Sequence, residues 1–204
     1  MIFQKFFILD AHYTVFVLSV GILPYPITFL ITDIISEIYG REKANKLVLS
    51  GFFASIFTVV ILMVADSTRA ASFSPVNDST ISQVFGLFGP AVFASMCEYL
   101  LAQFIDIRIF HFLKNATGGR FFWLRNNFST LFSQMVDTAS VLILLCLASD
   151  MGGATGLQWE RFPELFVGGY LFKVFIAVGD TPIAYFCCYI LRKKFKLKMG
   201  ETIR

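Results

Sequence analysis

The stretch Leu47-Val-Leu-Ser-Gly-Phe-Phe-Ala-Ser-Ile-Phe-Thr-Val-Val-Ile-Leu-Met-Val-Ala65 decides the fold class, because it contains no charged side chain. A helix that crosses the hydrocarbon core of a bilayer needs about 20 apolar residues. Lipid offers no hydrogen bonds to an open backbone, so a segment of this kind must be helical. The stretch therefore predicts a membrane-spanning α-helix.

The rest of the chain has the same apolar character. Of its 204 residues, 56% are hydrophobic and only 15% are charged, whereas about 25% are charged in soluble domains. A soluble fold of this size cannot bury so much apolar surface. The net charge of +3 comes from short basic runs and is not a nucleic-acid signature. We therefore expect a single transmembrane domain over residues 1–204, an all-α polytopic helix bundle.

Five apolar runs are long enough to cross a bilayer, and each predicts one helix. The predicted spans are Tyr13–Thr32, Leu47–Ala65, Ile81–Phe104, Asn126–Ser149 and Leu165–Leu191. Pro24 and Pro26 should break the first span, and Pro182 should kink the last one.

The basic residues alternate between the connections. Gly40–Lys46, Ile105–Arg125 and the tail after Leu191 together hold 13 of the 17 lysines and arginines. The loops Asp66–Thr80 and Asp150–Glu164 hold one arginine each. Because cytoplasmic loops of membrane proteins are enriched in Lys and Arg, the three basic segments and the C-terminus are predicted to be cytoplasmic.

An odd number of spans with a cytoplasmic C-terminus would place the N-terminus outside the cell. An even number is commoner. We therefore expect a further helix upstream of Met1 in the natural protein, or that Ile2–Leu9 is its remnant.

Ionisable side chains inside the spans are costly and are functional candidates. Asp137 shares a helix face with Thr130, Ser133, Gln134 and Ser140, and this polar stripe must face the protein interior. The stripe fits either contact between helices through small hydroxyl residues or a functional site.

Five further charged positions lie in or near the spans. A central lysine, Lys173, needs a carboxylate partner, and Asp137, Glu98 and Asp180 are the candidates. Asp33 and Glu37 lie one helical turn apart at the end of the first span, where a solvated helix end and a functional role are both open.

Enzyme signatures are scarce in the sequence. It has two histidines, no HExxH, GxSxG or Walker motif, and four cysteines without metal-ligand spacing. We therefore predict neither catalytic residues nor a metal or cofactor, and a protein that is not an enzyme.

Three motifs, in order along the chain, resemble the signature of the queuosine precursor transporter family. They are Pro26-Ile-Thr-Phe-Leu-Ile-Thr-Asp33-Ile-Ile-Ser-Glu37-Ile-Tyr39-Gly40, then Gln103-Phe-Ile-Asp106-Ile-Arg108-Ile-Phe-His111, then Trp123-Leu-Arg125-Asn126-Asn127-Phe-Ser129-Thr130 continuing to Gln134-Met-Val-Asp137-Thr138. A lysine in the last span, here Lys173, fits as well.

The resemblance implies an inner-membrane carrier of six helices, similar to vitamin-uptake carriers, whose first helix this chain lacks. It implies import of a 7-deazaguanine base (preQ0, preQ1 or queuine) for tRNA modification. The partners implied are this small molecule and the lipid bilayer, without nucleic acid. The energy source stays open, as does a homo-oligomer or an energy-coupling partner.

A deazaguanine presents ring N–H and amine donors beside a carbonyl acceptor. A buried carboxylate can accept two such donors, and Gln, Asn or Lys can serve the carbonyl. The residues predicted to bind substrate are Asp137, Lys173, Gln134, Glu98, Asn127 and Asp33.

Three other functions are open from the sequence. A substrate-binding subunit of an energy-coupling-factor vitamin transporter would copurify with an ATPase pair. An intramembrane enzyme using the Asp/Glu/Lys cluster would alter its substrate chemically. A structural assembly subunit would tolerate changes of Asp137 that preserve packing.

Overall fold

Helices make up most of the structure, a computed structural model that describes residues 6–11, 14–19, 25–85, 90–150, 158–198 and 201–203. The helices are α1 (Tyr25–Tyr39), α2 (Arg41–Ser67), α3 (Asp78–Phe85), α4 (Pro90–Ala116), α5 (Phe122–Asp150) and α6 (Phe162–Phe195). A 3-10 turn, Trp159–Arg161, leads into α6. The predicted helical class is confirmed for the described residues from Tyr25 onward.

The N-terminal segment departs from the prediction. Strands β1 (Phe6–Ala11) and β2 (Thr14–Ser19) form an antiparallel hairpin with Phe6 opposite Ser19. The predicted helix over Tyr13–Thr32 is therefore wrong in its first part, and α1 begins only at Tyr25. Valine and aromatic residues dominate β2 and favour strands as readily as apolar helices.

Two further expectations concern this segment. Pro24 lies outside the described residues, whereas Pro26 lies in the first turn of α1, where its missing N–H costs nothing. The described part of the segment Ile2–Leu9 is strand rather than the remnant of a helix. At 15 residues, α1 is shorter than the roughly 20 needed to cross a bilayer.

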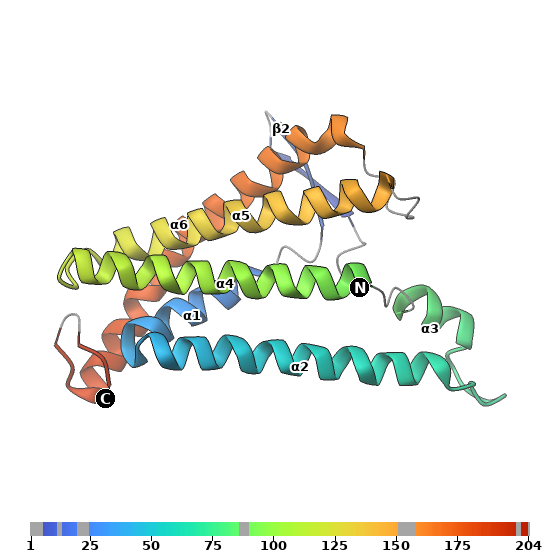
Figure 1. The fold of residues 1–204 in the computed structure, drawn as a ribbon, viewed down its shortest axis with the longest axis horizontal. Helices are drawn as coiled ribbons and strands as arrows, with labels where there is room; N and C mark the ends of the chain where they lie inside the picture. Colours follow the sequence, from blue (N-terminus) through green and yellow to red (C-terminus); the bar gives the residue numbers. More distant parts are fainter. Residues whose placement is uncertain are drawn as a thin grey trace.

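The helices converge at one end of the molecule and spread toward the other (Figure 1). Helix α5 packs against both α4 and α6, while α1 packs against α6 and α2. The converging end holds the α1–α2 turn, the α4–α5 connection and the C-terminus. Gly40, with φ of 83°, makes that first turn in a conformation that glycine adopts without strain. All three basic segments therefore lie at one end, as the predicted alternation requires.

Three helical segments are long and apolar enough to cross a membrane within the described ranges. They are Arg41–Ser67, Phe122–Leu147 and Trp159–Phe195. The predicted span Ile81–Phe104 is divided instead, because Ile81 belongs to α3 and α4 begins at Pro90.

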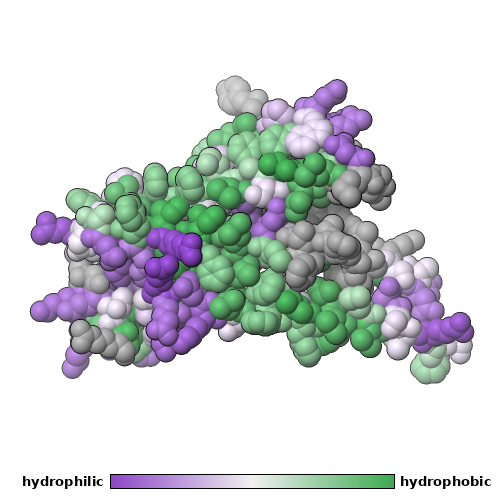
Figure 2. Space-filling view, viewed as in Figure 1, coloured by the Kyte–Doolittle hydropathy of each residue, from purple (hydrophilic) through white to green (hydrophobic). Residues whose placement is uncertain are grey.

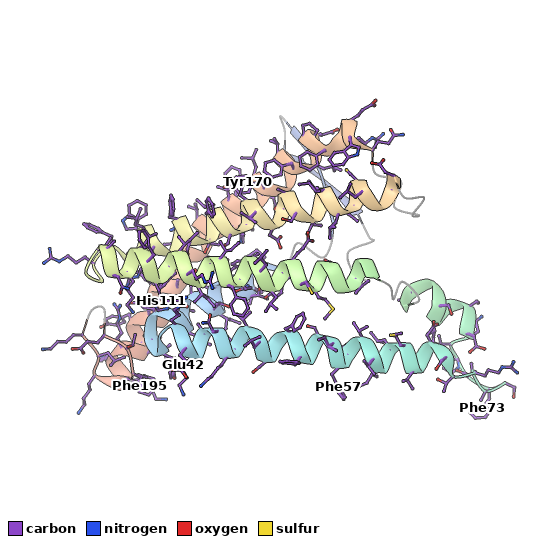
Figure 3. The ribbon with its side chains drawn as sticks, in the orientation of Figure 1. Glu42, Phe57, Phe73, His111, Tyr170 and Phe195 are labelled. Carbon is purple, nitrogen blue, oxygen red and sulfur yellow. The ribbon has the colours of Figure 1, made fainter. Side chains whose placement is uncertain are left out.

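Large apolar side chains cover the outside of the bundle. Phe57 on α2 is 65% exposed and Phe175 on α6 is 73% exposed. Phe57 points away from the neighbouring helices in Figure 3. Figure 2 shows this apolar surface across the middle of the molecule, with hydrophilic residues toward its ends. Such a surface belongs in lipid, so the chain is an integral membrane protein.

The interior of the bundle is polar for its size. The predicted stripe on α5 faces inward, since Thr130, Ser133, Gln134 and Asp137 are all buried. Asp33 and Glu37 are also buried, with exposed fractions of 1% and 0%, so neither caps a solvated helix end. Because polar groups inside an apolar exterior are costly, these buried groups are the candidates for function.

Candidate substrate pocket

A pocket opens among α1, α5 and α6. The space between these helices is about 240 Å³ when its open mouth is included. The lining residues are Pro26, Phe29, Leu30 and Asp33 from α1, Asn126, Thr130 and Gln134 from α5, and Ala177 and Asp180 from α6.

Several buried polar atoms in this lining have no hydrogen-bond partner among the described residues. They are Oδ1 of Asp33, Oδ1 of Asn126, and both amide atoms of Gln134. Gln134 is 0% exposed and Asn126 is 4% exposed. Buried polar groups are nearly always hydrogen-bonded, because leaving one unpaired costs about 1–3 kcal/mol. These atoms are therefore available to a polar ligand.

Neighbouring hydroxyl groups donate hydrogen bonds to the carboxyl groups of Asp33 and Asp106. The Thr130 hydroxyl donates to Oδ2 of Asp33 over 3.0 Å. Asp106, fully buried on α4, lies beside Asp33 and accepts a hydrogen bond of 3.2 Å from Ser133. The contacts with Thr130 and Asp106 fix the Asp33 carboxyl group in the pocket wall.

Of the three candidate partners for Lys173, the structure pairs it with Asp137. Lys173 Nζ donates to Asp137 Oδ2 over 3.0 Å and to the Thr138 hydroxyl over 2.9 Å. Both charged side chains are nearly buried. Asp137 follows Gln134 by about one helical turn, and Lys173 precedes Ala177 by one turn. The ion pair thus lies beside the pocket without lining it.

Two other predicted site residues lie apart from the pocket lining. Glu98 on α4 is half-buried, and it lies close enough to the Asp137 carboxylate for the two charges to repel each other. The Asn127 amide donates to the Thr181 hydroxyl over 2.8 Å and to the Trp123 carbonyl over 2.9 Å. Asn127 therefore joins α5 to α6. The sequence analysis predicted Asn127 as a binding residue, but its neighbour Asn126 lines the pocket instead.

Sequence reasoning missed a charged cluster around Glu37. Its carboxylate contacts Arg125 at 2.7 Å and Lys114 at 3.2 Å, and also contacts Arg192. The Arg125 guanidinium lies over the rings of Phe110 and Phe122. The cluster joins α1, α4, α5 and α6 at the converging end. The sequence does indicate that the three basic segments meet at this end. It does not indicate which of their 13 lysines and arginines contact Glu37.

These features define a class of protein. An apolar bundle that encloses a polar pocket with unpaired hydrogen-bonding atoms is the architecture of a membrane carrier for a polar small molecule.

The comparisons agree with this class. Residues 19–187 match the model of the family described as "Putative vitamin uptake transporter", and the chain belongs to this family. It is similar to a "Probable queuosine precursor transporter" of Bacillus subtilis, with 24% identity over 82% of this chain and 70% of that protein. A protein of the same description from Haemophilus influenzae is 27% identical over 90% of this chain and 74% of its own length. No solved structure matches the chain. The resemblance seen in the sequence motifs is confirmed.

Proposed function

We propose that the protein imports a queuosine precursor, a 7-deazaguanine base, across the cell inner membrane. The observation that carries this proposal is the set of unpaired atoms on Asp33, Asn126 and Gln134 in one pocket. The unpaired oxygen of a carboxylate accepts an N–H donor, and a glutamine amide both donates and accepts. Together they complement the donor and acceptor edge of a guanine-like ring.

The apolar lining fits the same ligand. Phe29 and Leu30 offer apolar surface to a flat ring, and Phe29 is held edge-to-face against Tyr99 with ring centroids 6.5 Å apart. The names of the two curated relatives support this substrate class for the chain. Transport without chemical change of the base also accords with a family of transporters.

The finer topology belongs to the same proposal. We place the converging end of the bundle in the cytoplasm, because it holds the three basic segments. The C-terminus then lies inside the cell.

Uptake by cells that cannot make queuosine tests the proposal. Such cells, given labelled 7-deazaguanine precursors, should accumulate label and queuosine in tRNA only when they express this chain. The variant Gln134→Ala should lose uptake while its membrane level stays normal. Equal accumulation with and without the chain, in cells lacking another carrier, would refute the proposal. A chemically altered base appearing in purified vesicles would favour an enzyme instead.

A further inference from the structure

The pocket contains two acidic side chains and no basic one. Asp33 projects from α1 and Asp180 from α6, and the seven other lining residues are uncharged. Asp33 is buried and Asp180 is half-buried. The lining therefore brings carboxyl groups, and no basic side chain, to the pocket.

Cations that could neutralise these acids are engaged elsewhere. Lys173 is bound to Asp137, and Lys114, Arg125 and Arg192 all contact Glu37. Asp180 makes no hydrogen bond or ion pair with any described residue. The next residue on its helix, Thr181, is hydrogen-bonded to Asn127. A positive charge on the ligand would find its partner in Asp180.

Independent evidence that the pocket receives a ligand comes from the residues of α5. Gln134 is completely buried, lines the pocket and has neither amide atom paired with a described residue. Asp33 and Asn126 each present one unpaired oxygen beside it. These groups suit the neutral edge of the base, which leaves Asp180 on α6 for the substituent.

We propose that Asp180 determines specificity and that the pocket prefers a 7-deazaguanine bearing a protonated amine to one bearing a neutral substituent. This inference rests on the proposed function. A primary amine carries a proton at neutral pH, as lysine does. A hydrogen bond between charged groups is worth about 10- to 100-fold in affinity when it forms in a partly dry site. A nitrile in the same position has no charge and no donor for the carboxylate.

Direct binding measurements on the purified full chain test the proposal. The probes are 7-aminomethyl-7-deazaguanine, which is cationic, and 7-cyano-7-deazaguanine, which is neutral. The wild-type chain in lipid nanodiscs should bind the amine at least about tenfold more tightly than the nitrile. The variant Asp180→Asn should lose this advantage by weakening amine binding about 10- to 100-fold, with nitrile binding unchanged. Glu164→Gln, which removes an exposed acid from the same helix, should change neither affinity.

The outcomes separate the two proposals. Binding of neither probe by the wild type overturns the proposed function and this inference with it. Equal binding of both probes overturns the inference alone and leaves the proposed function standing. Retained nitrile binding shows that Asp180→Asn is folded. Loss of both ligands in that variant would make Asp180 a general support of the pocket and refute its role in charge selection.

Discussion

The carboxylate of Glu37 and the guanidinium of Arg125 lie 2.7 Å apart, and neither side chain has any exposed surface. The pair joins α1 to α5 at the end where the helices converge. Lys114 and Arg192 extend it to α4 and α6, so that one carboxylate connects four helices. Asp33 precedes Glu37 by one turn of α1 and belongs to the pocket lining. The packing of this end therefore positions the pocket wall.

Replacing Glu37 with Gln should destabilise the protein severely. The change leaves three cations in a buried site without their carboxylate, and breaking a buried ion pair typically costs about 3–5 kcal/mol. Thermal unfolding of the purified protein in detergent measures the effect. Glu42→Gln is the matched control, because Glu42 pairs only with exposed Lys46 and should leave the unfolding temperature unchanged. Equal unfolding temperatures for both variants would contradict the prediction.

Adjacent asparagines provide a second test. Asn126 lines the pocket with an unpaired oxygen, whereas Asn127 is bonded to Thr181. Asn126→Ala should therefore weaken binding of the base about 2- to 10-fold, the effect of one neutral hydrogen bond. Asn127→Ala should leave binding unchanged and cost about 1 kcal/mol of stability. The reverse pattern, with binding lost only in Asn127→Ala, would return Asn127 to the site and remove Asn126 from it.

The orientation of the bundle can be read by labelling. In a variant without the four native cysteines, Ser72→Cys places a thiol in the exposed α2–α3 loop. Asn115→Cys places one near the exposed end of α4, in a basic segment. A membrane-impermeant maleimide should label position 72 in sealed cells, and position 115 only after the cells are opened. Labelling of position 115 in sealed cells would invert the topology.

Much of this fold could be predicted from hydrophobicity alone. The uncharged run Leu47–Ala65 is helical within α2, and the polar stripe around Asp137 is buried as its spacing indicated. Lipid allows few alternatives to a helix for such segments. The same reasoning failed at Thr14–Ser19, where a short apolar run forms a strand, because composition does not distinguish a hairpin from half a helix.

The site was predicted less completely. The face that a residue shares on its own helix follows from local sequence spacing, whereas a pocket forms between residues of different helices. Spacing along α5 identified Gln134 and Asp137, and the cost of an isolated lysine required a partner for Lys173. No local pattern shows that Asp33 on α1 and Asp180 on α6 face the same space. That relationship depends on how the helices pack. The choice of Asn127 over Asn126 failed for the same reason, because one residue rotates the side chain by about 100° around the helix.

The buried pair Asp137 and Lys173 provides the last test, because a structural role and a functional role predict different behaviour. If the two side chains only neutralise each other, replacing both with apolar residues of similar size should be nearly neutral. We expect instead that the double variant Asp137→Leu with Lys173→Met reaches the membrane at a normal level and loses uptake. The pair lies about one turn from Gln134 and Ala177, which line the pocket. At that distance we expect its charges to affect binding of the base.

The single variants are the controls for this experiment. Asp137→Leu alone leaves a buried lysine without its partner, and Lys173→Met alone leaves a buried carboxylate without its partner. Each single variant should therefore lose about 3–5 kcal/mol of stability and reach the membrane at a lower level. Restoration of that level in the double variant would show that the defect of each single variant was the unpaired charge. Any uptake defect that persists at a normal level is then functional. Normal uptake in the double variant would make the pair structural and restrict the substrate site to the pocket lining.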